Sequence, residues 1–234
     1  MSKKTYKNVR LSLLTSGFTL VSSTDTTAVL PPEFSSFTVK THSGQSTDVD
    51  KPIGTVSGDL LLACIGWEYS SKTPVPPSGW TLVQSFTGSG KSAAIYYKVA
   101  TGSEPSTYTW GLSSSGDSFI VHIARYLNID NDNPINASAK TQGNSTTAVA
   151  PSVTTNVNGC IIVRFCSSSF NEHNPELTST PATQRDIESI ADWSSQGFSD
   201  STQESAGATG TANFAIFSNF TTHATFTIAL QPAS

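Results

Sequence analysis

The sequence predicts an all-β protein, a β-sandwich of jelly-roll type preceded by an extended N-terminal arm. Three observations support this fold class. Serine and threonine make up 68 of the 234 residues, and β-branched threonine suits pleated strands. Residues 147–163 and 205–234 contain no Asp, Glu, Lys or Arg, although helix surfaces normally carry such side chains. Strand-sized runs also recur between clusters of Gly, Pro, Asn and Asp, as in sandwiches.

Residues 1–32 are predicted to form the arm, because a strand-like mix of Leu, Phe, Ser and Thr there ends in the stiff pair Pro31 and Pro32. The net charge is −4 for the whole chain, but −8 beyond the first ten residues, where nine basic side chains accompany all seventeen acidic ones. A basic arm before an acidic body indicates docking onto protein rather than nucleic acid, whose phosphates the body would repel. The candidate partner-binding residues are Lys3, Lys4, Lys7, Arg10, Leu13, Phe18 and Leu20.

Residues 33–234 are predicted to form one sandwich body. The run 60–67 is continuously apolar, as expected for a strand at the centre of a sheet. Near the C-terminus, Ala224, Phe226 and Ile228 alternate with polar residues, which is typical of a half-buried strand. The expected strands are residues 36–41, 60–67, 80–83, 93–100, 107–112, 119–126, 137–141, 153–155, 160–166, 184–191, 214–217 and 221–230.

Two further segments have alternative structural interpretations, and one N-terminal apolar run is weighed as a signal peptide. A short helix is an alternative for residues 186–193, and residues 199–212 are either a flexible loop or a flat strand with a weakly specified register. No tandem repeat is evident. No apolar run reaches the ~18 residues of a membrane-spanning helix, and the short run 11–21, which resembles a signal peptide, is interrupted by Thr and Ser. No membrane association is expected.

Metal and disulfide chemistry find little support. The three cysteines, Cys64, Cys160 and Cys166, form no metal-binding spacing and are predicted to be small core residues. Asn128, Asp130 and Asp132 alternate like the front half of a calcium loop. Asn and Asp are also the usual turn residues, so a plain turn is the favoured interpretation and no cofactor is predicted.

The sequence also offers no convincing catalytic set. His122 shares a face with apolar neighbours and is best explained as a hydrogen-bonded core histidine, and no Gly-x-Ser-x-Gly elbow occurs. A sugar-binding role is an alternative for exposed aromatic side chains with a carboxylate beside them. The candidates for carbohydrate binding are Trp67, Glu68, Tyr69, Trp110 and Trp193. The prediction is that the protein is not an enzyme.

Three motifs in fixed order carry a resemblance. They are KPIGTVSGDLLL at residues 51–62, PPSGWTL at 76–82 and YYKVATGSEPSTYTW at 96–110. Together they resemble a β-sandwich module of virion surface proteins of tailed bacteriophages and of related bacterial adhesins. The segments LLTSGFTL at 13–20 and TTAV at 26–29 are similar, more loosely, to the opening strand of phage head-decoration and fibre proteins.

The resemblance implies a structural or binding role without a catalytic set. The leading hypothesis is a capsid decoration (cement) or head-fibre protein, docked through its arm onto the major capsid protein or another virion protein. It would be made in the host cytoplasm, displayed on the virion surface and associated as a homotrimer. The alternative is a tail-fibre or adhesin module that binds a host surface glycan.

Overall fold

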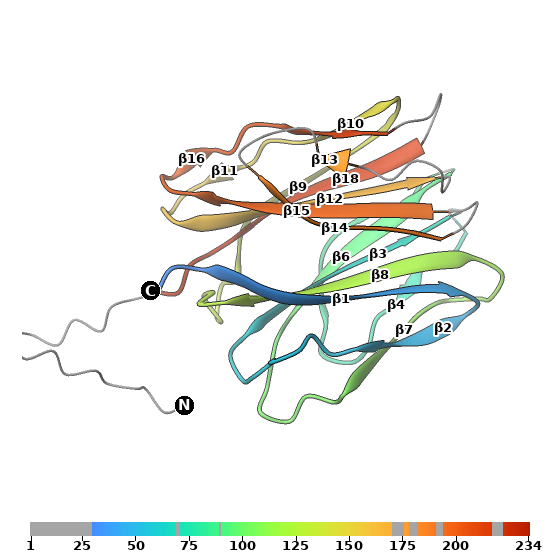
Figure 1. The fold of residues 1–234 in the computed structure, drawn as a ribbon, viewed down its shortest axis with the longest axis horizontal. Coiled ribbons are helices and arrows are strands. Elements are labelled where there is room, and N and C mark those ends of the chain that lie inside the picture. The colour runs from blue at the N-terminus through green and yellow to red at the C-terminus, as the bar shows by residue number, and fades with distance from the viewer. Residues whose placement is uncertain are drawn as a thin grey trace, which may run out of the picture.

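The structure is a computed structural model that describes residues 30–68, 71–88, 90–169, 176–177, 182–190, 194–216 and 222–234. Within these residues the chain forms strands β1 to β18 and no helix. The strands stack as layered antiparallel sheets (Figure 1). The predicted all-β sandwich is therefore confirmed, whereas the jelly-roll connectivity stays a prediction.

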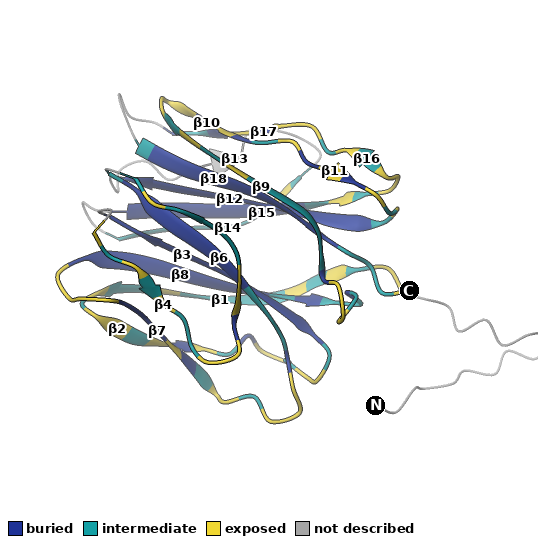
Figure 2. Cartoon of the chain, turned by 180° about the vertical axis from the view of Figure 1, so that it is seen from behind, coloured by how far each residue is buried: buried dark blue, intermediate teal, exposed yellow. Residues whose placement is uncertain are grey.

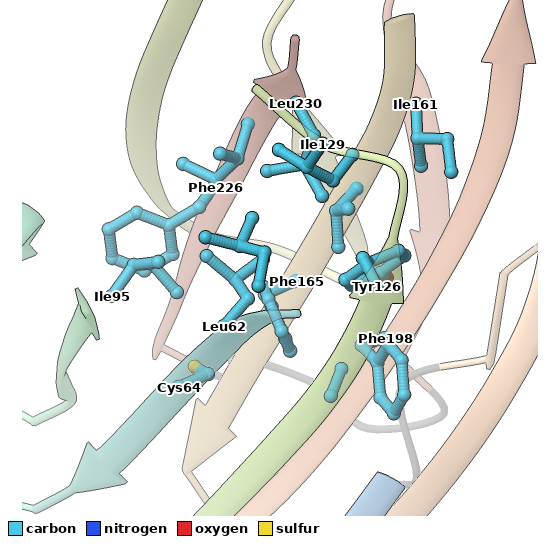
Figure 3. Close-up of a cluster of buried hydrophobic side chains, with 14 of the residues drawn as sticks. Leu62, Cys64, Ile95, Tyr126, Ile129, Ile161, Phe165, Phe198, Phe226 and Leu230 are labelled. Atoms are coloured by element: carbon cyan, nitrogen blue, oxygen red, sulfur yellow. The ribbon is translucent and has the colours of Figure 1, made fainter. Parts of the chain in front are cut away.

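Two five-stranded sheets form the centre of the molecule. The first contains, in order, β1 (Glu33–Ser43), β8 (Ser118–Leu127), β3 (Leu60–Trp67), β6 (Ser92–Val99) and β5 (Thr81–Phe86). The second contains β14 (Thr183–Ile190), β15 (Ser194–Gln203), β12 (Cys160–Ser169), β18 (Thr222–Leu230) and β9 (Ile135–Asn144). Their facing surfaces enclose an inner core, to which the first sheet gives Leu62 and Ile95 and the second gives Phe165, Phe198 and Phe226 (Figure 3).

Smaller sheets cover the outer faces of the two central sheets. The first is covered by β2 (Ser46–Asp50), β7 (Thr107–Leu112) and β4 (Pro74–Val75). The second is covered by β10 (Thr147–Ala150), β17 (Ala212–Ala215) and β13 (Glu176–Leu177), and by the pair β11 (Thr154–Thr155) and β16 (Gly207–Ala208). The central strands are consequently buried on both faces (Figure 2). All eight residues of β3 are buried, which explains its unbroken apolar run.

The second half of the chain repeats the strand order of the first, although no repeat is evident in the sequence. We define the first half as residues 33–127 and the second half as residues 135–230. If β9 is matched to β1, β12 to β3, β14 to β5, β15 to β6 and β18 to β8, the order β1-β8-β3-β6-β5 becomes β9-β18-β12-β15-β14. The small sheet β2-β7-β4 likewise becomes β10-β17-β13.

Irregularities in strand pairing recur at the matched positions. The pairing of β1 with β8 shifts register between Phe34 and Ser36, and that of β9 with β18 shifts between Ile135 and Ala137. The pairing of β5 with β6 shifts after Leu82, and that of β14 with β15 shifts after Gln184. Because register shifts are specific local features, their recurrence shows that the two halves share one architecture in detail.

Two local expectations are corrected. The alternative of a short helix over residues 186–193 is wrong for its described part, because Asp186 to Ile190 belong to β14. Residues 199–212 are not one flexible loop, since they include the end of β15, all of β16 and the start of β17. The cysteine prediction is confirmed, because all three thiols are free and buried.

Candidate functional site

The described chain enters and leaves the sandwich at the same end, which we call the terminal end (Figure 1). Nδ2 of Asn128 donates a hydrogen bond to the carbonyl of Pro31 (2.8 Å). The backbone N–H of Ala233 donates to the carbonyl of Asn128 (2.9 Å), and Ile129 forms a β-bridge with Pro232. The segment before β1, the connection between the halves and the C-terminal segment therefore meet at one turn.

The Asn/Asp cluster at this end forms a hydrogen-bonded turn. Oδ1 of Asp130 accepts hydrogen bonds from the backbone N–H groups of Asp132 (2.9 Å) and Asn133 (3.1 Å), and Oδ2 accepts one from Gln231 (3.0 Å). The two backbone donors lower the pKa of Asp130. Asn128 takes a left-handed conformation with φ 58°, which Asn tolerates. Across the described residues, no group of three His, Cys, Asp or Glu side chains could hold a metal ion.

The terminal end also exposes apolar side chains. Ile53 is 83% exposed, Leu30 is 62% exposed and Val56 is 60% exposed, and these are the most exposed large apolar residues among those described. Leu30 lies just before Pro31 and Pro32, which lead into β1, and the other two lie in the loop from β2 to β3. These side chains are therefore the candidates for an apolar contact surface at this end.

This loop is held in place by an ion pair between its base and β8. Nε of Arg125 donates to Oδ2 of Asp59 (2.6 Å), and its Nη1 donates to the carbonyl of Ile53 (3.2 Å). The same carboxylate oxygen accepts a hydrogen bond from the backbone N–H of Val56 (2.8 Å). The exposed apolar side chains are therefore presented by a braced loop, which limits the entropy lost when they contact a partner.

A second braced loop of the terminal end is built from the third motif of the resemblance. Glu104 accepts hydrogen bonds from Nζ of Lys98 (2.8 Å), the hydroxyl of Tyr108 (2.8 Å) and the backbone N–H of Thr101 (2.8 Å). Burial alone would raise the pKa of Glu104, but these hydrogen bonds lower it to about 2. The carboxylate thus joins β6, β7 and the loop between them.

Glu104→Gln should lower the free energy of unfolding by about 2 kcal/mol at pH 7, because hydrogen bonds to a charged group are lost. The folded pKa lies below the usual 4.5, so the stabilisation is present above pH 4.5 and is lost as the pH falls toward 2. Urea unfolding of both proteins at pH 7 and pH 3 should show the difference shrinking at the lower pH. The exposed Glu33→Gln variant is the control. Equal stability of Glu104→Gln and wild type at pH 7 would contradict the assignment.

At the opposite end of the sandwich, two buried titratable side chains lie at the ends of neighbouring strands. Trp67 of β3 pairs with Ser92 of β6, so Glu68 and Lys91 are the next cross-strand neighbours. Both are buried, and Lys91 is 0% exposed. Nζ of Lys91 donates a hydrogen bond to the hydroxyl of Ser194 on the second sheet. Lys91 thus connects the two halves through a neutral partner.

Burial dominates the titration of this pair. It lowers the pKa of Lys91 to about 8, although Glu68 and, more weakly, Cys64, Cys166 and Asp117 favour the charged form. Burial raises the pKa of Glu68, Lys91 partly offsets this effect, and Asp117 adds to it. A buried cation that is hydrogen-bonded to a neutral group lowers the stability of the fold, because its desolvation cost is not recovered.

A buried histidine lies in the same region. Nδ1 of His122 is 2.8 Å from Oε1 of Gln196, and Nε2 is 2.8 Å from Oδ2 of Asp186. Nε2 of Gln196 donates to the carbonyl of Ile120 (3.2 Å), which fixes the orientation of the amide. The prediction of a hydrogen-bonded core histidine is confirmed. His122, Gln196, Lys91 and Ser194 are all 0% exposed, so in this structure they are out of reach of a dissolved substrate.

The expectation that Trp67 and Trp110 are exposed for sugar stacking is wrong. They are 1% and 0% exposed because the sheet β2-β7-β4 covers this face of the first central sheet. The ring of Trp110 packs against Trp80 (5.0 Å between centroids) and Tyr96 (5.5 Å). Nε1 of Trp67 donates to the carbonyl of Lys72 (3.2 Å). These rings build a core and present no face to a ligand.

Several predicted site residues lie outside the described part of the chain. They are Tyr69, Trp193 and the arm residues Lys3, Lys4, Lys7, Arg10, Leu13, Phe18 and Leu20. Glu68, the remaining sugar-binding candidate, is buried beside Lys91. Sequence reasoning missed Lys91, Ile53 and Val56. Lys91 alternates with Ala93 and Ile95, a pattern that would have placed it on the inner face.

Compared with protein-family models, curated proteins and solved structures, the chain matches none of them. The described part of the chain also contains no helix long and apolar enough to cross a membrane.

Proposed function

We propose that the protein is a structural protein on the surface of a tailed-bacteriophage virion, a capsid decoration (cement) or head-fibre protein that docks through its N-terminal arm. The observation that carries the proposal is the terminal end. There the chain ends emerge beside Leu30, Ile53 and Val56, the most exposed large apolar side chains described. The arm and this surface would form one continuous attachment site, and the opposite end would point away from the particle.

Charge supports the same orientation. Four of the thirteen basic residues lie in the first ten positions, whereas the rest of the chain has a net charge of −8. The arm can therefore contact an acidic virion protein that the body alone would repel. The major capsid protein is the expected partner, and a homotrimer would bring three arms together on one particle site.

Deleting residues 2–29 should abolish binding to particles of the virus that encodes the protein, because the charged part of the attachment site is removed. The body should stay folded, since the deletion ends before Leu30 and leaves the contact between Pro31 and Asn128 intact. Cosedimentation with particles that lack the protein measures binding, and thermal unfolding checks the body. Full binding by the deletion variant would overturn the proposal.

A second variant tests the exposed apolar surface in the same binding experiment. The double variant Ile53→Ser and Val56→Ser should weaken particle binding at least ~10-fold, because two apolar contacts are worth more than 1.4 kcal/mol. Val75→Ser is the matched control, because Val75 is also exposed (50%) but lies in β4. Equal binding by the double variant and the control would remove this surface from the attachment site.

The alternative function is a tail-fibre or adhesin module that binds host glycans. With Trp67 and Trp110 buried, this alternative depends on Tyr69 and Trp193. Reproducible binding on a glycan array that is lost in Trp193→Ala would favour it over the cement hypothesis.

A further inference from the structure

We infer that the chain is a fused dimer of one duplicated module. The inner face of the first half is then a docking surface for the second half of another copy of the chain, and the inner face of the second half is one for the first half of that copy. The inference is independent of the proposed function. The strand orders and the register shifts of the two halves repeat, and the loops between the strands add further matches.

Hydrogen bonds outside the strands recur at matched positions. The N–H of Gly58 donates to the carbonyl of Ala100 (2.9 Å), and the N–H of Gly159 donates to the carbonyl of Gln203 (2.9 Å). Both glycines precede the central strand of their sheet and have positive φ, 92° and 75°, which other residues rarely adopt. One turn geometry is thus used twice.

A second pair of hydrogen bonds joins the small sheets in the same way. The N–H of Leu112 donates to the carbonyl of Gln45 (2.8 Å), and the N–H of Ile216 donates to the carbonyl of Thr146 (2.8 Å). Each bond links the end of the middle strand of a small sheet to the turn before that sheet's first strand. The matches therefore extend from the central sheets to the outer layers.

The contact between the halves resembles a twofold interface at its two edges. In a twofold interface, every contact between two elements is repeated by the two matching elements. Here β1 contacts β14 and β5 contacts β9, and these two contacts exchange when the halves are interchanged. The contacts of β8 with β14 and β15 are more extensive than the matching contacts of β18 with β5 and β6, so the symmetry is approximate. Arg185 of β14 stacks over Phe34 of β1 (4.3 Å), and the matched residues Val83 and Ile135 both pack against the inner core.

The halves are also separable as units. In the described residues no sheet combines strands of both halves, and the chain crosses between them once, at residues 128–134. Side chains hold the inner faces together through the apolar inner core and through bonds such as His122 to Gln196 and Tyr126 to Asp200 (3.3 Å). An apolar interface of this kind resembles that of an obligate dimer.

The length of the connection decides whether a half can reach its own partner. β9 lies against β5, which is three strands away from β8 in the first sheet. The connection must therefore cross ~14 Å along the sheet and, at right angles, ~10 Å between the sheets, which is a direct distance of about 17 Å. Deleting residues 130–133 leaves four Cα steps between Leu127 and Ile135, or about 14 Å when extended. The shortened chain is then about 3 Å too short to close on itself without releasing a strand end.

The full chain without residues 130–133 should therefore form a dimer in which each half packs against the complementary half of the other copy. Light scattering should give twice the mass of the wild-type protein, with an unchanged far-ultraviolet spectrum. The control replaces residues 130–133 with Gly-Ser-Gly-Ser, which removes the same side chains but keeps the length, and it should keep the wild-type mass. A folded deletion variant with the wild-type mass would overturn the inference. So would an aggregated or unfolded deletion variant beside a folded control, because the halves would then fail to pair outside one chain.

Discussion

Phe198→Ala should lower the free energy of unfolding by about 4 kcal/mol, as expected when a fully buried phenylalanine is truncated in a packed core. The side chain is 0% exposed and belongs to β15. Its ring contacts both halves of the chain, with centroid distances of 5.4 Å to Phe165, 5.6 Å to Phe37 and 6.2 Å to Phe34. Its removal therefore leaves a cavity in the interface itself.

The cavity is expected to persist because its walls cannot collapse. Phe165 is held within the central strand of the second sheet. His122, whose ring centre lies 5.4 Å from that of Phe198, is fixed by its hydrogen bonds to Gln196 and Asp186. Destabilisation by a rigid cavity lies at the upper end of the observed range.

Guanidinium unfolding followed by tryptophan fluorescence measures the effect. Phe198→Leu retains most of the volume and should cost about 1 kcal/mol, and Ile53→Ala, at an 83% exposed position, should change stability by less than ~0.5 kcal/mol. A loss below ~1 kcal/mol for Phe198→Ala would show that the two sheets do not pack across this ring.

The sequence was informative wherever apolar residues mark a strand. The run 60–67 coincides with β3, and the predicted inner positions of the last strand, such as Phe226 and Ile228, lie in the inner core. β15 was missed because seven of its ten residues, Ser194 to Asp200, are buried without an apolar pattern. Its burial comes from β12 and β14 on either side and from the facing sheet, none of which is local information.

The duplication escaped sequence reasoning for a related reason. Backbone geometry repeats between the halves while side chains differ, so that Asp59 of the first half corresponds to Cys160 of the second and Ala63 to Arg164. Glycine is shared at 58 and 159, because the backbone has positive φ at both of these matched positions. Strand order and bulges carry the repeat, and neither can be seen in residue identity.

Lys91→Met is expected to raise the free energy of unfolding by about 3 kcal/mol at pH 7. The ammonium group is fully buried, and its hydrogen bond goes to the neutral hydroxyl of Ser194. Its pKa of about 8 lies below the usual 10.5, and each unit of that shift corresponds to ~1.4 kcal/mol. Methionine fills a similar volume without a charge, so the desolvation cost of the ammonium group disappears, and Glu68, whose pKa burial already raises, can take up a proton instead of staying as an unpaired anion.

The gain should depend on pH in a defined window. Because the folded pKa is lowered, charged Lys91 opposes folding fully below pH 8, and this cost fades as the pH rises toward 10.5. Burial also raises the pKa values of Cys64 and Cys166, which lowers the stability of both proteins above pH 9. The difference between Lys91→Met and wild type removes most of this shared effect, and it should shrink steadily from pH 8 to pH 10.5.

Lys72→Met is the matched control, because Lys72 lies at the same end but is paired. Its Nζ is 3.0 Å from Oδ2 of Asp117, whose side chain is 2% exposed. Removing the paired cation leaves a buried carboxylate alone, so this variant should lose about 2 kcal/mol. Urea unfolding at pH 7, 9 and 10.5 measures all three proteins. A destabilised Lys91→Met at pH 7, with no change in the difference up to pH 10.5, would mean that the Lys91 ammonium group is paired as well as that of Lys72.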